Sequence, residues 1–159
     1  MDETGRMFRD ATPADAPALR DLERAANLAG LGHVFDPDRH PFPDDDVLAR
    51  WALVLREPGV RTLVRDDTAL VAHDLGTLRH VAVHPDRWHE GWGRRCVEVA
   101  VAGMRAAGTA EPRLWVLTAN HRARGLYEHL GWRPTGRTQE SPWPPYPEEQ
   151  EYVLPADPA

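Results

Sequence analysis

The spacing of apolar side chains changes several times along the chain, and each change predicts a new element of secondary structure. Apolar positions at helical spacing begin after Thr12, which supplies a capping hydroxyl, and Asp15 stands where a capping box needs an acid. A helix is therefore predicted over residues 12–29. Segment 30–46 is rich in proline and aspartate and predicts a loop, and a second helical stripe follows over residues 45–57.

Runs rich in β-branched and apolar residues predict short strands on either side of these helices. The predicted strands lie at residues 7–9, 61–65, 68–73 and 77–83. Tight turns join the last three of these runs, which is typical of an antiparallel meander.

The apolar period changes again in the second half of the chain. A helix over 93–108, a strand over 114–117 and a helix over 120–130 predict a right-handed parallel crossover from the strand before them. The tail, residues 132–154, has room for two more strands. The pattern as a whole predicts one domain over residues 1–159, of the α/β (α+β) class, with a mixed, mostly antiparallel sheet of six or seven strands and about four helices.

Composition removes several classes of function. The chain has 159 residues and a formal net charge of −6, whereas a generic nucleic-acid-binding protein is usually basic, so no nucleic-acid partner is expected. It has no lysine, which excludes a Walker A phosphate loop and a lysine Schiff base. Its only serine, Ser141, lies outside any Gly-x-Ser-x-Gly elbow, and its only cysteine, Cys96, excludes an internal disulfide. Since we find no membrane-spanning run and no secretory signal, we expect a cytoplasmic protein without a membrane partner.

The most informative stretch lies where the strand ending at Val83 gives way to a helix. His84-Pro85 follows the strand, and a loop with glycines at 91 and 93 leads into the helix. Backbone N–H groups at such a helix start are unpaired and can hold a pyrophosphate, and glycines let the backbone approach the anion closely. The dinucleotide-binding fingerprint does not fit, because its third glycine position is Cys96.

A second motif follows one strand later and makes the signal specific. It contains Asn120, Ala123, Leu126, Tyr127, Glu128, Leu130, Gly131 and Trp132. Together with the Val-x-Val-x-Pro strand end at 81–85 and the loop at 88–93, this motif resembles the GNAT-type N-acetyltransferase superfamily. Members show a Q/R-x-x-G-x-G/A loop and an N-x-x-A-x-x-L-Y-E-x-L-G-F/W helix, and the resemblance covers residues 61–136 well.

The resemblance implies acetyl transfer from acetyl-CoA to an amine, directly and through a ternary complex. It assigns the pantetheine arm to the strand end, the pyrophosphate to the loop, a hydrogen bond to Asn120, and protonation of the leaving thiolate to Tyr127. The implied cosubstrate-binding residues are Val81, Ala82, Val83, Trp88, His89, Glu90, Gly91, Trp92, Gly93, Arg94, Asn120, Ala123 and Tyr127. Two of them depart from the loop pattern. Trp88 replaces the glutamine or arginine, and Glu90 places an acid beside the pyrophosphate, which is unfavourable unless it points away or pairs with Arg94 or Arg95.

The general base is not set by a motif. Many members of the superfamily carry a glutamate in the strand before Val81, but this segment reads Thr77-Leu78-Arg79-His80. Histidine is the side chain whose ordinary pKa lies nearest neutral pH, so His80 and His73 are the candidate bases, and proton transfer through water alone is the alternative. Simple alternation puts His80 on the opposite face of the strand from Val81 and Val83.

Several alternatives remain open at this point. The chain is also compatible with an acyltransferase for another acyl-CoA, a non-catalytic acyl-CoA sensor, or an interaction module on the same fold. The acceptor pocket is expected from the segments with least motif content, 30–46 and 139–149. Four possible ligands in the first of these segments have no spacing that sets a metal geometry, so no metal is expected. A monomer and a homodimer are both compatible with the sequence.

Overall fold

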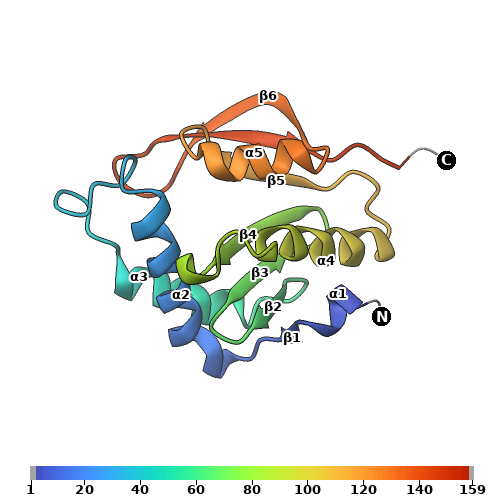
Figure 1. Ribbon diagram of the computed structural model, residues 1–159, viewed down its shortest axis with the longest axis horizontal. Helices are drawn as coiled ribbons and strands as arrows, with labels where there is room; N and C mark the ends of the chain where they lie inside the picture. Colours follow the sequence, from blue (N-terminus) through green and yellow to red (C-terminus); the bar gives the residue numbers. More distant parts are fainter. Residues whose placement is uncertain (1–2, 158–159) are drawn as a thin grey trace.

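The computed structural model describes residues 3–157, and its centre is one seven-stranded sheet with the order β1-β2-β3-β4-β5-β7-β6 (Figure 1). The strands are β1 (Arg9–Asp10), β2 (Arg61–Arg65), β3 (Ala69–His73), β4 (Thr77–Val83), β5 (Arg113–Leu117), β6 (Arg133–Glu140) and β7 (Glu148–Val153). Every neighbouring pair is antiparallel except β4 and β5, which are parallel and joined through a helix. The predicted fold class and the parallel crossover are thereby confirmed.

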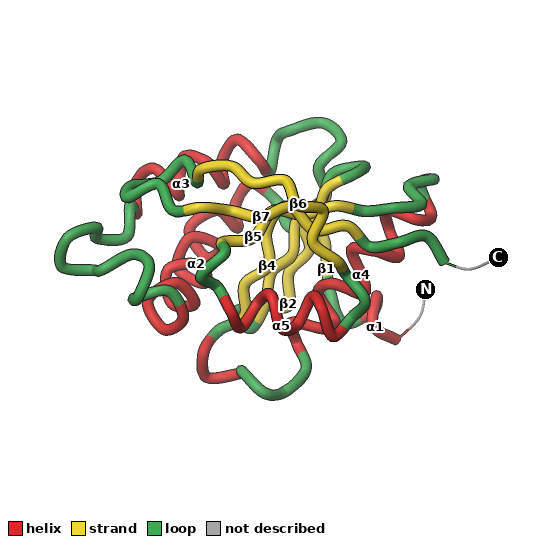
Figure 2. The backbone as a smooth tube through the Cα atoms, turned by 90° about the horizontal axis from the view of Figure 1, so that it is seen from above, coloured by secondary structure: helices red, strands yellow, loops and turns green. Residues whose placement is uncertain are grey.

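Helices cover both faces of the sheet, as the view along a second direction shows (Figure 2). They are α1 (Glu3–Arg6), α2 (Ala16–Gly30), α3 (Asp44–Val54), α4 (Trp92–Ala106) and α5 (His121–His129), with single 3₁₀ turns at Pro13–Asp15 and Pro85–Arg87. Buried residues of α2 and α3 pack on one face and those of α4 and α5 on the other. The short α1 was not predicted, and the predicted helix over 12–29 starts as a 3₁₀ turn before α2.

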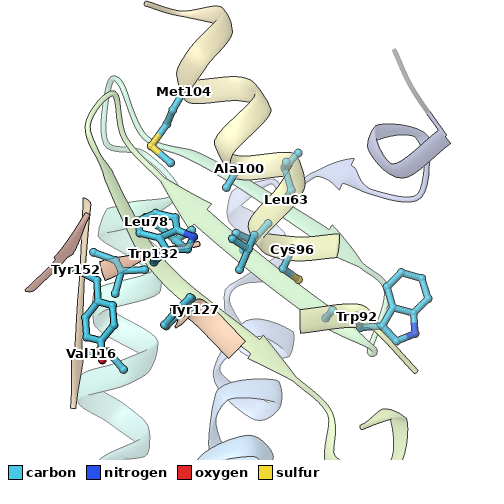
Figure 3. Close-up of a cluster of buried hydrophobic side chains, with 14 of the residues drawn as sticks. Leu63, Leu78, Trp92, Cys96, Ala100, Met104, Val116, Tyr127, Trp132 and Tyr152 are labelled. Carbon is cyan, nitrogen blue, oxygen red and sulfur yellow. The ribbon is translucent and has the colours of Figure 1, made fainter. Parts of the chain in front are cut away.

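The core on the α4 side is the larger of the two. Cys96, Ala100 and Met104 of α4 point at the sheet, with Tyr127 of α5 beside them (Figure 3). Leu78 and Val81 of β4 both contribute to this core although they are three positions apart. The opposite core is built around the fully buried Trp51 of α3 and Leu19 of α2.

A β-bulge in β4 explains this spacing. In the register with β3, Ala72 lies opposite His80 and His73 lies opposite Leu78, so Arg79 is the extra residue. The bulge bends β4, and its parallel pairing with β5 extends over only two residues, Thr77 and Leu78. Beyond Leu78 the two strands separate, and the open edge of β4 faces the cleft described below.

The predicted capping acid, Asp15, makes hydrogen bonds at the start of α2. The backbone N–H of Thr12 donates to Asp15 Oδ2 at 2.7 Å, and the guanidinium of Arg9 in β1 binds both oxygens of the same carboxylate, at 3.0 and 2.8 Å. The predicted capping acid therefore also ties the first strand to the first long helix. The hydrogen bonds from Arg9 are the largest cause of the low pKa of Asp15, which is about 2.

This low pKa predicts an acid-dependent contribution to stability. A carboxyl group whose pKa is lowered on folding stabilises the fold above its ordinary pKa of 3.8, and the stabilisation is lost as pH falls through that value towards 2. We expect Asp15→Asn to lower the free energy of unfolding by about 1 kcal/mol at pH 7, after allowance for solvent screening at Arg9. Urea unfolding of the variant and the parent should show this difference shrinking to nothing near pH 2. The exposed Asp67→Asn serves as the matched control, and an equal effect in both variants at pH 7 would refute the assignment.

Candidate active site

A cleft of about 1140 Å³ lies where β4 and β5 separate. Its walls come from β4 and the loop after it, the start of α4, β5 and α5 on one side, and from α2, α3 and both predicted acceptor segments on the other. Pockets for one drug-sized ligand have volumes of about 300–1,000 Å³, so this cleft has room for a ligand larger than a drug-sized molecule. Sequence segments far apart in the chain therefore share one cavity.

The start of α4 forms a cradle for an anion. Gly91 has φ of 83° and precedes the helix, and the first backbone bond of the helix runs from Arg95 N–H to Gly91 O at 3.1 Å. The N–H groups of the first turn before Arg95 have no partner inside the helix. His89 also has a positive φ, 68°, so the loop turns sharply to present these donors at the cleft. This geometry is the one that binds phosphate groups at helix N-termini.

Gly93 has a packing role as well as its place in the cradle. A Cβ added at Gly93 would lie 3.1 Å from Leu126 Cδ2, so a larger residue here would require the Leu126 side chain to shift, and α4 and α5 are closely packed at this point. The approach brings the second sequence motif, on α5, next to the first.

Glu90 does not line the cleft. Its carboxylate accepts two hydrogen bonds from Arg87 Nε, at 2.9 and 3.0 Å, and one from the indole of Trp92 at 3.3 Å. Of the two arrangements that the sequence left open, Glu90 points away from the cleft. It does not pair with the side chains of Arg94 or Arg95, because Arg94 is bound to Glu98 at 2.6 Å and Arg95 donates to the backbone oxygen of Glu90. The hydrogen bond from Arg87 lowers the pKa of Glu90, whose charge is thus neutralised outside the cradle.

The two tryptophans of the loop point in different directions. Trp92 is buried against Phe8, with ring centroids 6.2 Å apart, so only its backbone belongs to the cradle. Trp88 lines the cleft, and its indole N–H donates to Val83 O at 2.8 Å. The predicted contribution of Trp92 is therefore limited to its N–H group, whereas the side chain of Trp88 forms part of the wall.

The open edge of β4 presents backbone groups to the cleft. His84 N–H bonds to Thr68 O, on the side of β3, and successive residues of a strand turn their hydrogen-bonding groups to opposite neighbours. The backbone groups of Val81 and Val83 are therefore directed away from β3, where β5 has already separated from β4. The bond from Trp88 to Val83 O agrees with this direction.

Helix α5 carries the polar groups of the second motif. Asn120 caps the helix, its Oδ1 accepting from Ala123 N–H at 3.2 Å, which leaves the side-chain NH₂ group of Asn120 for a ligand. Tyr127 lies two turns later and lines the cleft with its otherwise buried side chain. Burial raises the pKa of Tyr127 above its ordinary value, so the phenol keeps its proton at neutral pH.

The two candidate histidines occupy different environments. His80 lines the cleft on the α3 side, where its ring lies 5.1 Å from that of Trp51. Burial, with the charges of Arg50 and Arg79, lowers the pKa of His80 to about 3, so its imidazole is neutral in the physiological range. His73 does not line the cleft, because it is buried on the other face, with Nε2 3.2 Å from where a Cβ of Gly103 would stand. The proposed base role of His73 is thus ruled out by its position.

The acceptor half of the cleft contains charged residues that no sequence motif indicated. Arg50 of α3 donates to both carboxylate oxygens of Glu23 of α2, at 2.7 and 2.8 Å. Both residues lie on helices predicted from apolar spacing, but nothing in that spacing marks their polar positions as part of a site. Trp143 lines the same half, whereas Tyr146 is exposed outside it.

No group of three or more potential metal-ligating side chains comes together within residues 3–157. Within the same residues, every helix is too short or too polar to span a membrane.

Comparison with known proteins places this architecture in a family. Residues 7–132 match the family described as Acetyltransferase (GNAT) family. The mycothiol acetyltransferase of Beutenbergia cavernae is 31% identical over 108 residues, which are 62% of this chain and only 36% of that relative. The chain therefore spans about a third of that relative's length.

Solved structures of low sequence identity share the fold. An acetyltransferase from Thermus thermophilus superposes with a TM-score of 0.71 at 21% identity, over 93% of this chain and 95% of that one. The PaiA N-acetyltransferase of Thermoplasma acidophilum, solved with coenzyme A, gives 0.66 at 14% identity over 91% and 96% of the two chains. Since the family match covers most of the chain and both sequence motifs meet in one cleft, this chain belongs to the GNAT family of acetyltransferases.

Proposed function

We propose that this protein transfers the acetyl group of acetyl-CoA directly to an amine, within a ternary complex in the β4–β5 cleft. The observation that carries the proposal is that one cavity joins the α4 cradle, the open edge of β4, Tyr127 and a separate acceptor half. Structural relatives solved with coenzyme A or acetyl-CoA bound support the choice of cosubstrate.

Acetyl-CoA would lie along the wall formed by β4, α4 and α5. The N–H groups of the first turn of α4 would bind the pyrophosphate, and the NH₂ group of Asn120 would bind the pantetheine arm. The outward backbone groups of Val81 and the N–H of Val83 would hold the same arm, and an N–H group of this edge would face the thioester oxygen. These roles use atoms that have no other partner within their own helix or strand.

The chemistry needs a nucleophile, a site for the oxyanion and an acid. The amine lone pair attacks the thioester carbon, and a backbone N–H of β4 stabilises the tetrahedral oxyanion. The C–S bond then breaks, and Tyr127 gives its proton to the departing thiolate, regaining one from the proton that the attacking amine releases to water. A covalent acyl-enzyme is disfavoured, because burial raises the pKa of Cys96 to about 12 and keeps its thiol protonated.

His80 is better suited to positioning than to proton abstraction. A base with a pKa of about 3 is far from the value near 7 that serves general-base catalysis at neutral pH. We infer that His80 remains a neutral hydrogen-bonding group beside the acceptor, and that the amine loses its proton to water. Proton transfer through water alone, the alternative to a histidine base, is therefore favoured.

The test of the proposal is amine-dependent release of CoA from acetyl-CoA, with Tyr127→Phe as the diagnostic variant. Loss of a positioned acid costs about 10²–10⁴-fold in rate, so we expect kcat to fall by about 10²-fold. The dissociation constant for acetyl-CoA should change by less than about twofold, because the aromatic ring is kept. Calorimetry and steady-state kinetics measure the two quantities separately.

Tyr146→Phe is the matched control, since Tyr146 is exposed and does not line the cleft. Unchanged turnover in Tyr127→Phe would remove Tyr127 from the mechanism. Tight acetyl-CoA binding by the parent without acetylation of any amine would instead favour the non-catalytic sensor.

The pH dependence tests the role of His80. Since its imidazole stays neutral above about pH 4, the rise of kcat/KM with pH should follow ionisation of the acceptor amine. We therefore expect His80→Gln to lower kcat/KM without moving the midpoint of this rise, as measured between about pH 5.5 and 9.5. If the parent's kcat/KM instead rose with a midpoint near pH 6.5, and this rise were absent in His80→Gln, His80 would be the base.

A further inference from the structure

The arginines of the cleft differ in whether their charge is already satisfied. Six arginines line it, and four of them are paired with carboxylates: Arg50 with Glu23, Arg79 with Glu57 and Asp74, Arg87 with Glu90, and Arg94 with Glu98. Within residues 3–157, Arg39 and Arg122 have no carboxylate partner. Arg39 belongs to the exposed loop of the acceptor half, so Arg122 is the unpaired cation on the α5 wall.

Arg122 is held in place by stacking. Its guanidinium carbon lies 3.4 Å above the centroid of the Trp88 ring, a distance that indicates close face-to-face contact. Trp88 is itself fixed on two sides, by the 2.8 Å bond to Val83 O and by packing against Gly30 at the end of α2. The planar cation is therefore oriented in advance, with its N–H donors free.

Among the described residues, the charge of Arg122 also lacks the hydrogen-bonding partners that other arginines have. The pKa of Arg122 is lowered by burial, whereas those of Arg9, Arg79 and Arg124 are raised by hydrogen-bonding partners. A guanidinium that lines the cleft without a carboxylate partner can bind an anion, and phosphate matches its fork of donors.

The position of the pair also accounts for the departure at residue 88. The loop motif has a glutamine or arginine there, and this chain has a tryptophan, which brings no charge to the cradle. The stack places a guanidinium beside this loop position, because Arg122 lies directly on the Trp88 ring. The acid of the loop does not cancel it, since Glu90 is bound to Arg87.

We propose that Arg122, held flat against Trp88, is a phosphate-binding residue for the CoA cosubstrate, on the same wall of the cleft as the N–H groups of α4. The proposal rests on the proposed function in that the ligand is CoA. Arg122 would bind either the pyrophosphate or the ribose 3′-phosphate of CoA. Comparing CoA with 3′-dephospho-CoA distinguishes these two possibilities.

The test is calorimetric titration of the full chain with CoA and with 3′-dephospho-CoA, in the parent and in Arg122→Gln. Loss of a bidentate charge-assisted contact should weaken CoA binding by about 10- to 100-fold. If Arg122 binds the 3′-phosphate, the substitution weakens CoA alone and leaves 3′-dephospho-CoA unchanged. If it binds the pyrophosphate, both ligands are weakened by the same factor.

Two further variants distinguish loss of the positive charge at Arg122 from a general effect on the structure. Arg122→Lys keeps a cation without the planar fork and should recover a large part of the affinity lost in Arg122→Gln. Arg133→Gln removes an exposed arginine of β6 and should leave CoA affinity unchanged. Thermal unfolding midpoints of all three variants should agree within about 2 °C, since the guanidinium of Arg122 has no structural ion pair.

CoA affinity in Arg122→Gln within twofold of the parent would overturn the phosphate role while leaving acetyl transfer intact. Equal loss in the lysine and glutamine variants, with a lowered unfolding midpoint, would make Arg122 a structural residue and also overturn the proposal. Failure of the parent to bind CoA at all would overturn the proposed function itself, and the phosphate role with it.

Discussion

The separation of β4 and β5 is the constraint on which the rest of the site depends. Two parallel strands can hydrogen-bond along their whole length, but here the pairing stops after two residues, because the bulge at Arg79 bends β4 away. The separation leaves the backbone groups of Val81 and Val83 without a neighbouring strand. It also opens the interior of the sheet to ligands, so the proposed binding wall for acetyl-CoA consists of main-chain atoms that a regular sheet would have used in hydrogen bonds between strands.

The helices complete the cleft by what they present at their first turns. Helix α4 directs its unpaired N–H groups at the cavity, and the close packing at Gly93 brings α5 alongside with Asn120 and Tyr127. Dipoles and hydrogen-bond donors held in a partly desolvated cavity act without reorganisation, which is the basis of electrostatic stabilisation in acyl transfer. The phenol of Tyr127, kept protonated by burial, is placed on the same wall.

Charge pairing decides which groups are available to ligands. Glu23, Glu90 and Glu98 each bind one guanidinium, and Glu57 and Asp74 bind that of Arg79. Four of the six cleft arginines are therefore paired before any substrate binds. The acceptor half therefore combines a paired charge with the neutral His80 and the aromatic ring of Trp143. Arg122, the unpaired arginine of α5, lies on the wall proposed to bind the cosubstrate, which matches the anionic character of CoA.

Apart from the short α1, the sequence by itself determined the element order, and it indicated the family and the backbone cradle. Apolar periodicity reports which face of an element is buried, and glycine at 91 and asparagine at 120 mark helix starts, because their conformational and capping roles are local. Only the tertiary structure decided the partners of Glu90, the exclusion of His73 from the cleft, and the meeting of Trp88 with Arg122. Those outcomes depend on side chains from elements distant in the chain, and on a bulge that shifts the alternation of β4. Ion pairs and stacked rings between such elements leave no periodic trace in a sequence, so residues 23, 50 and 122 became recognisable as part of the site only after folding placed them on one cavity.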